Sequence, residues 1–201
     1  RSAEAIPSER LLRFARNDSN LDSNEMKYKD KIIEAMELLS KNRKVLFLGQ
    51  SVSYPGSMVY RTLCRVPESK KIELPVIEDV QMGLSIGLSL EGFIPVSIYP
   101  RIDFLILAMN QMVNHLDKIE DISRGRFRPK VIIRTAIGSR VPLYPGLQHC
   151  SDYTQVFKGI FRNIKVIKLS KSKEIIPAYR QALDSPGSTL LIEMADLYEK
   201  G

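Results

Sequence analysis

The sequence predicts a doubly wound α/β fold, with a mainly parallel sheet and helices on both of its faces. Short apolar segments that are rich in β-branched residues and bounded by turn residues are typical of buried strands, and they occupy residues 44–49, 94–99, 130–134, 164–168 and 188–193. Helical segments alternate with them, at residues 80–90, 104–116, 153–159 and 172–183, after a first helix marked by Ile32, Ile33, Met36 and Leu39. Apolar strands separated by helices indicate a parallel sheet that is covered on both faces.

The chain has enough apolar residues for one sizeable domain and little room for a second. It has 201 residues, of which 44% are hydrophobic. Residues 1–25 are polar and lack a strong apolar period, so we expect an N-terminal extension or a cloning remnant there, with Met26 as the natural start. Residues 26–201 form the predicted domain. In such a sheet, ligands bind beyond the carboxyl ends of the strands.

Composition and charge disfavour several classes of function. The formal net charge is +7 at pH 7, which we interpret as solubility with some bias toward anionic ligands. Lys and Arg are scattered, without a zinc-ligand spacing, so a nucleic-acid partner is not expected. Cys64 and Cys150 form no paired motif, which argues against a metal site and is typical of a reducing cytoplasm. No apolar run reaches membrane-spanning length, so we expect a cytoplasmic protein without a membrane partner.

Glu78 places a carboxylate at the start of an otherwise apolar helix that follows a short strand. A carboxylate beside apolar neighbours is costly unless it has a partner or is protonated, and proteins that keep such a group often use it for proton transfer. The alternative is an acidic residue in the first helical turn, which the helix dipole favours. Both interpretations remain open from these residues alone.

Gly83, Gly87 and Gly92 follow Glu78 and indicate close approach of a neighbour. Glycines four residues apart lie on one helix face and lower the stability of a helix interior. A tightly packed neighbouring helix is one explanation, and contact with the domain's own sheet is the other. Since no P-loop lysine follows Gly49, another chain would hold much of the phosphate of a phosphorylated ligand.

Several short motifs occur in the order found in one enzyme family. They are residues 74–78, the spaced glycines to Gly92, and residues 94–97, 103–104, 110–114, 128–134, 148–149, 164–167 and 191–198. Residues 28–198 thereby resemble the pyrimidine-binding domain of transketolase-like, thiamin-diphosphate-dependent enzymes, most closely the beta subunit of pyruvate and branched-chain 2-oxoacid dehydrogenases. The resemblance implies the thiamin-diphosphate-binding fold.

The resemblance also implies roles for three residues. Glu78 matches the family glutamate that hydrogen-bonds the cofactor's aminopyrimidine and favours the tautomer whose ring nitrogen removes the thiazolium proton. Phe104 matches an aromatic residue that lies against this ring, although an aromatic residue at the start of a helix is more often plain core. His149 matches a histidine near the substrate, where it relays protons or holds a carboxylate. The other histidine, His115, is interpreted as structural or interfacial.

A partner subunit follows from the same resemblance. An alpha-type subunit is expected to hold the diphosphate and magnesium, in a homodimer or heterotetramer that decarboxylates a 2-oxoacid with acyl or aldehyde transfer. The chain alone is expected to be inactive, because the diphosphate-binding domain and, after Tyr198, the carboxyl-terminal domain are expected to be missing.

Departures from the family pattern leave alternatives open. Gln50–Ser51 replaces acidic residues that are common there, and Arg101 is either a clamp for an anionic ligand or a surface residue. The chain is alternatively a subunit of a two-chain non-oxidative decarboxylase or carbon–carbon lyase or ligase, or a non-catalytic regulatory homologue.

Overall fold

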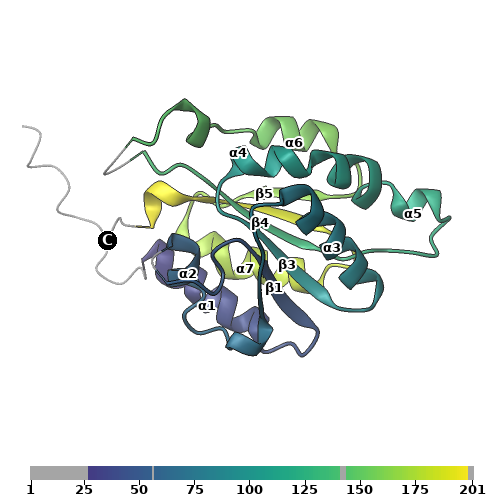
Figure 1. Ribbon diagram of the computed structural model, residues 1–201, viewed down its shortest axis with the longest axis horizontal. Coiled ribbons are helices and arrows are strands. Elements are labelled where there is room, and N and C mark those ends of the chain that lie inside the picture. Colours follow the sequence, from purple (N-terminus) through teal and green to yellow (C-terminus); the bar gives the residue numbers. More distant parts are fainter. Residues whose placement is uncertain (1–26, 56, 141–143, 199–201) are drawn as a thin grey trace, which may run out of the picture.

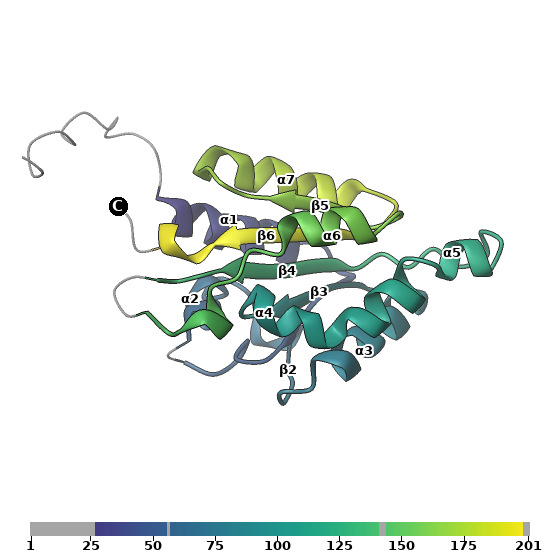
Figure 2. The same cartoon turned by 90° about the horizontal axis from the view of Figure 1, so that it is seen from above.

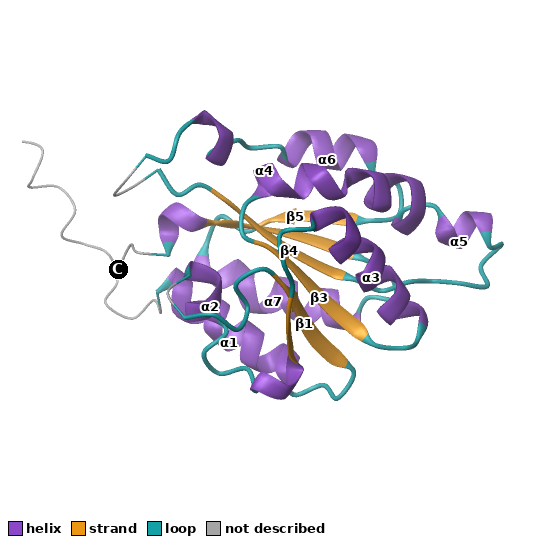
Figure 3. Cartoon of the chain, viewed as in Figure 1, coloured by secondary structure: helices purple, strands orange, loops and turns teal. Residues whose placement is uncertain are grey.

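Six parallel strands form the centre of the fold, in the order β2-β1-β3-β4-β6-β5 (Figures 1 and 3). The computed structural model describes residues 27–55, 57–140 and 144–198. The strands are β1 (Val45–Gly49), β2 (Lys71–Glu73), β3 (Ile94–Tyr99), β4 (Ile132–Ile137), β5 (Lys165–Lys168) and β6 (Thr189–Met194). The strand order changes direction between β1 and β3, where ligands bind in open α/β sheets. This topology confirms the predicted doubly wound α/β fold.

Helices cover both faces of the sheet (Figure 2). One face carries α1 (Tyr28–Ser40), α2 (Met58–Thr62) and α7 (Ser172–Asp184), and the other carries α3 (Glu78–Leu90), α4 (Ile102–Leu105) and α6 (Thr154–Ile160). The short helix α5 (Ile119–Ile122) protrudes beyond the sheet (Figure 1). Shorter helical turns span residues 68–70, 106–108, 111–116, 147–149 and 195–197. Each face of the sheet therefore has its own apolar core.

The side chains of β4 and β6 point alternately to the two faces of the sheet, and this alternation determines which core each of them joins. Ile132 and Leu191 pack with α1 and α7, whereas the next residues, Ile133 and Ile192, pack with α3 and α4. Since successive strand residues point to opposite faces, Arg134 lies on the α1 and α7 face, as does Glu193 on β6. The charged pair of Arg134 and Glu193 thus lies next to the apolar core of the α1 and α7 face, toward the carboxyl edge of the sheet.

Two sequence-predicted elements have different limits in the structure. The strand predicted at residues 130–134 begins at Ile132, because the Lys130 N–H bonds the Ser89 hydroxyl at 2.5 Å instead of joining a strand ladder. Residues 104–116 are helical, but they divide into α4, a 3₁₀ turn and a π-helical turn. Gly92 lies outside α3, in a turn with φ 86°, a left-handed conformation that glycine adopts without strain. Its predicted role on the helix face is therefore wrong.

Expectations from composition can also be compared with the structure. No helix among the described residues is long and apolar enough to cross a membrane. Cys64 and Cys150 are both free. The basic residues are less scattered than predicted, since residues 124–130 place four of them in one loop beside the exposed ring of Phe127.

Candidate functional site

The residues singled out from sequence lie at the carboxyl edge of the sheet. Glu78 begins α3 after β2, Phe104 lies in α4 directly after β3, and His149 lies in the segment that follows β4. The carboxyl ends of parallel strands meet at one edge, so the fold brings these three residues to the same side of the domain. This is the edge at which we expected a ligand to bind.

Glu78 is a largely buried residue whose carboxylate has no hydrogen-bond donor among the described residues. The residue is 8% exposed, and no described group donates a hydrogen bond to its side chain. Its backbone carbonyl accepts a hydrogen bond of 3.3 Å from the Tyr99 hydroxyl. Burial raises the pKa of Tyr99, and the negative charges of Glu78 and Asp79 raise it further. The Glu78 carboxylate oxygens are not among the buried polar atoms of the described residues that lack a partner, so the carboxylate reaches solvent and is open to a ligand or a partner chain.

The inner side of α3 is fixed to the strand ends by Gln81. Its side-chain amide donates to the Ile98 carbonyl at 2.9 Å and to the Ser97 hydroxyl at 3.1 Å. Gly49 permits this approach, because a Cβ atom at that position would lie 2.3 Å from the Ile98 carbonyl oxygen. Glu78 is therefore held at a defined position at the start of a rigid helix.

Phe104 and His149 are in direct contact. Their ring centroids lie 5.5 Å apart with an interplanar angle of 89°, an edge-to-face arrangement. The His149 Nδ1 atom is buried and has no hydrogen-bond partner. No hydrogen bond or ring contact joins Glu78 to these two described rings, so the structure pairs Phe104 with His149 and places Glu78 separately.

Arg101 positions the His149 segment, a role that we did not infer from sequence. Its Nη1 atom donates to the Gly138 carbonyl at 2.7 Å and to the His149 carbonyl at 2.9 Å. Neither sequence interpretation, a ligand clamp or a surface arginine, includes this bridge. Nearby, the Asp103 carboxylate accepts a hydrogen bond of 3.3 Å from the Ser151 N–H. The only signal in the sequence was the place of Arg101 directly after β3.

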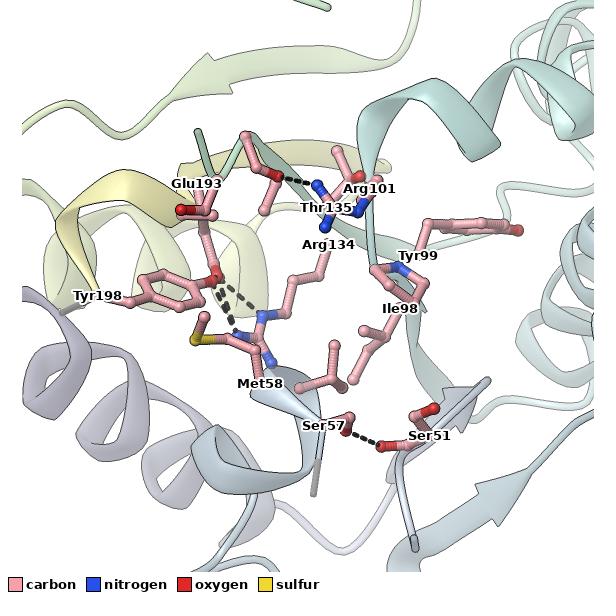
Figure 4. Close-up of a pocket in the computed structure, with 16 residues that line it drawn as sticks. Ser51, Ser57, Met58, Ile98, Tyr99, Arg101, Arg134, Thr135, Glu193 and Tyr198 are labelled. Carbon is pink, nitrogen blue, oxygen red and sulfur yellow. Dashed lines mark hydrogen bonds and ion pairs between the residues drawn. The ribbon is translucent and has the colours of Figure 1, made fainter. Parts of the chain in front are cut away.

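A cavity of about 200 Å³ adjoins this edge of the sheet (Figure 4). Arg101, Arg134 and Glu193 contribute charged groups to its wall, and Met58 and Ile98 contribute apolar ones. Because Arg101 also bonds the His149 carbonyl, the cavity and the His149 segment share one side chain. Among the described residues, no cluster of His, Cys, Asp and Glu side chains could hold a metal ion.

A buried ion pair forms the floor of this cavity. The Arg134 Nε and Nη2 atoms lie 2.7 Å and 2.9 Å from the two carboxylate oxygens of Glu193, and the Tyr179 and Tyr198 hydroxyls also donate to this carboxylate. Burial raises the pKa of both tyrosines, and the Glu193 charge raises it further. Burial acts to lower the pKa of Arg134, but Glu193 holds it well above its ordinary value. Arg134 therefore remains protonated beside Glu193.

The outer side of α3 is apolar and exposed. Val80 is 59% exposed and Leu84 is 40% exposed, next to exposed Val76 and Ile77 before the helix. A Cβ atom added at Gly87 would meet nothing within 4 Å, and one at Gly83 would meet only the Gln111 side chain, at 3.8 Å. The two glycines thus do not contact the domain's own sheet, contrary to one of the two sequence interpretations.

Sequence comparison finds distant relatives among dehydrogenase beta subunits. No family model matches the chain. The beta subunit of pyruvate dehydrogenase from Acholeplasma laidlawii is 22% identical over 174 residues, which cover 85% of this chain and 51% of that protein. The 3-methyl-2-oxobutanoate dehydrogenase subunit beta of Mycobacterium tuberculosis is 25% identical over 164 residues, or 78% of this chain and 45% of that protein. The mitochondrial pyruvate dehydrogenase beta subunit of Chaetomium thermophilum is 26% identical over 203 residues, or 98% and 52%.

Solved structures show the same fold. A split-gene transketolase, described as an inactive beta4 tetramer, superimposes with a TM-score of 0.63 at 14% identity and covers 84% of this chain and 51% of its own. A transketolase from Campylobacter jejuni gives a TM-score of 0.63 at 15% identity, with 92% of this chain and 29% of that one covered. The chain therefore has a transketolase-like α/β fold. It is a distant relative of the beta subunits of pyruvate and branched-chain 2-oxoacid dehydrogenases, and it spans about half the length of the curated relatives it matches.

Proposed function

We propose that this chain is the beta-type subunit of a thiamin-diphosphate-dependent enzyme that acts on a 2-oxoacid together with an alpha-type, diphosphate-binding partner. The observation that carries the proposal is the Glu78 carboxylate, which lies at the ligand edge of the sheet in a largely buried residue and has no donor among the described residues. The similarity to dehydrogenase beta subunits supports the aminopyrimidine ring of the cofactor as the donor that this carboxylate would meet.

The described residues suit the pyrimidine half of the cofactor. A carboxylate accepts a hydrogen bond from a protonated ring nitrogen, and the half-buried Phe104 ring offers an aromatic face for stacking. They do not suit its diphosphate half, because no described cluster could hold the magnesium ion. We therefore assign the diphosphate and its metal to the partner subunit.

Glu78 and His149 would act on different atoms. Thiamin diphosphate, when bound, would supply the nucleophilic carbon for chemistry on a 2-oxoacid, and the residues of this chain would orient it. Glu78 would hold a proton at the pyrimidine ring nitrogen, and the start of α3 would keep its carboxylate in place. His149, whose Nδ1 has no partner, would donate a hydrogen bond to the substrate carboxylate or relay a proton. Phe104 would fix the imidazole plane through its edge-to-face contact.

The exposed side of α3 supports assembly with another chain. Val80, Leu84 and the uncovered backbone at Gly87 offer an apolar surface that adjoins Glu78. A partner that covers this surface would remove water from the Glu78 carboxylate and strengthen its hydrogen bond to the cofactor. A homodimer or a heterotetramer would both satisfy this requirement.

Hydrogen exchange at the thiazolium carbon of the cofactor tests the role of Glu78. In the complex with the alpha-type subunit, Glu78→Gln should slow exchange by ~10²- to 10⁴-fold, as expected for the loss of a general acid or base. The matched control is Asp79→Asn, which makes the same chemical change one residue further along α3 and should leave exchange nearly unchanged. If Glu78→Gln exchanges as fast as the wild type, Glu78 is only a charge at a helix start and the chain is better explained as a non-catalytic regulatory homologue.

A further inference from the structure

The cavity on the α1 and α7 face contains an unsatisfied buried donor. Arg134 is 2% exposed, and its Nη1 atom has no hydrogen-bond partner. Figure 4 shows two nitrogens of this guanidinium directed at Glu193 and the third directed away from that carboxylate. Leaving a buried donor of a charged group unpaired costs free energy, so a third acceptor is expected at Nη1.

The charge of the cavity wall favours an anion. Arg134 and Glu193 neutralise one another, and no other described carboxylate lines the cavity. Arg101 adds a positive charge that is not paired with any carboxylate in the described part of the chain. The wall therefore carries a net positive charge, which stabilises a ligand with a single negative charge.

The remaining wall determines the shape of that anion. Met58, Val59, Ile98, Ala136 and Ala195 supply apolar surface, and the volume is about 200 Å³. A doubly charged phosphate would place oxygens against these apolar side chains, where each unpaired oxygen would be desolvated at a cost. A carboxylate with a short hydrocarbon tail can instead place its charge at the arginines and its tail against the apolar residues.

We infer that this cavity is a binding site for a small monocarboxylate, with Arg134 Nη1 as the buried donor and Arg101 as the second positive charge. The site is separate from Glu78, which lies at the start of α3 on the opposite face of the sheet. The inference does not depend on the proposed catalytic function. An occupant would contact the arginine that bonds the His149 carbonyl, and so would adjoin the segment that carries His149.

Nuclear magnetic resonance titration of the labelled chain tests the site. Sodium acetate and sodium butyrate are the charged probes, and acetamide is the neutral match to acetate. We expect saturable shifts of the arginine side-chain signals with a dissociation constant in the millimolar range, tighter binding of butyrate than of acetate, and no saturation by acetamide. Equal binding of acetamide and acetate, or no saturable shift with either acid, would show that the cavity holds only water or neutral solutes and would overturn the inference.

Two variants localise the binding. Ala136 lines the cavity, because it follows Arg134 by two residues on β4 and faces the same side of the sheet. Ala136→Leu therefore adds bulk to the cavity wall, and it removes no side-chain hydrogen bond. The double variant Arg134→Met, Glu193→Gln removes the donor and its counter-charge together, which keeps the interior neutral. Each should weaken acetate binding at least about tenfold. A folded Ala136→Leu protein that binds acetate with unchanged affinity would place the anion elsewhere and contradict the assignment.

Discussion

Helices α3 and α7 each have 13 residues and lie on opposite faces of one sheet, but they distribute their polar groups in opposite ways. α7 buries an apolar side that includes Ile175 and Ala182. α3 buries Glu78, Gln81 and Ser85 beside apolar residues and exposes Val80 and Leu84 to solvent. A helix that serves only its own domain turns its apolar side inward.

This difference indicates that the α7 side stabilises the domain, whereas the outer side of α3 is available for the proposed assembly with another chain. Near α7, Tyr179 and Arg134 both bond Glu193, so this buried carboxylate is paired within the domain. On the α3 side, the Glu78 carboxylate has no donor and the outer helix surface has no cover. We therefore expect substitutions near α7 to lower stability and substitutions on the outer side of α3 to lower association or activity.

Arg134→Ala should have the largest effect on stability. It leaves the Glu193 carboxylate buried without its countercharge, so the free energy of unfolding should fall by ~3–5 kcal/mol in a urea titration. The control is Arg134→Met, Glu193→Gln, which removes both charges and should recover much of the loss. A fall of less than about 1 kcal/mol for Arg134→Ala would mean that the pair is not the main polar support of this face.

His149→Ala should reduce activity and leave stability nearly unchanged. We expect turnover of the 2-oxoacid by the complex to fall by ~10²-fold, at the lower end for an acid or base, while thiazolium exchange continues at the wild-type rate. Single-turnover kinetics separates these two steps. The matched control is His115→Ala, which truncates an exposed histidine. Turnover that survives His149→Ala would assign the substrate chemistry to the partner subunit.

Serine substitutions at Leu84 on α3 and at Ile175 on α7 test whether the two helices differ in their contribution to stability and to association. Leu84 is 40% exposed and Ile175 is fully buried, so Leu84→Ser should change the free energy of unfolding by only ~0.5 kcal/mol. Ile175→Ser should destabilise the domain by ~2–5 kcal/mol, by analogy with truncation of a buried isoleucine. Sedimentation velocity should show that Leu84→Ser alone weakens association of the folded chain. Equal association of Leu84→Ser and wild type would remove the outer side of α3 as an interface.

Alkaline pH should lower the stability of the domain, in part through the tyrosines that contact Glu193. The pKa values of Tyr179 and Tyr198 are raised in the folded state, from an ordinary value of 10.0, by burial and by the Glu193 charge. Above pH 10 the unfolded chain loses phenolic protons that the folded chain retains, so the free energy of unfolding should fall as pH rises. Each retained proton contributes a slope of ~1.4 kcal/mol per pH unit. Tyr179→Phe should reduce this slope in urea titrations at alkaline pH, and an unchanged slope would contradict the raised pKa.

The sequence predicted most of the fold because its strands are short, apolar and clearly separated. The strand at residues 94–99 and the helix at residues 172–183 lie where they were expected, within one residue. α2 and α5 were not predicted, since helices of 5 and 4 residues contain too few turns to show an apolar period. The π-helical turn at residues 111–116 was predicted as part of an ordinary helix, because its apolar spacing resembles that of an α-helix.

The candidate site was less accessible to sequence reasoning. The resemblance selected Phe104 and His149, and the structure places their rings in contact, but their predicted roles remain predictions. The bridge from Arg101 to the His149 carbonyl joins residues 48 positions apart and has no local pattern. The ion pair between Arg134 and Glu193 spans 59 positions, and only the pairing of β4 with β6 brings its members together.

Calorimetric titration with thiamin diphosphate and magnesium can show whether the α3 side of the domain is half of a shared cofactor site. The isolated chain should bind the cofactor poorly, because no described residues could hold its metal. The complex with the alpha-type subunit should bind it with a dissociation constant in the micromolar range, and Glu78→Gln should weaken that binding. Micromolar binding by the isolated chain would contradict the division of the site between two subunits.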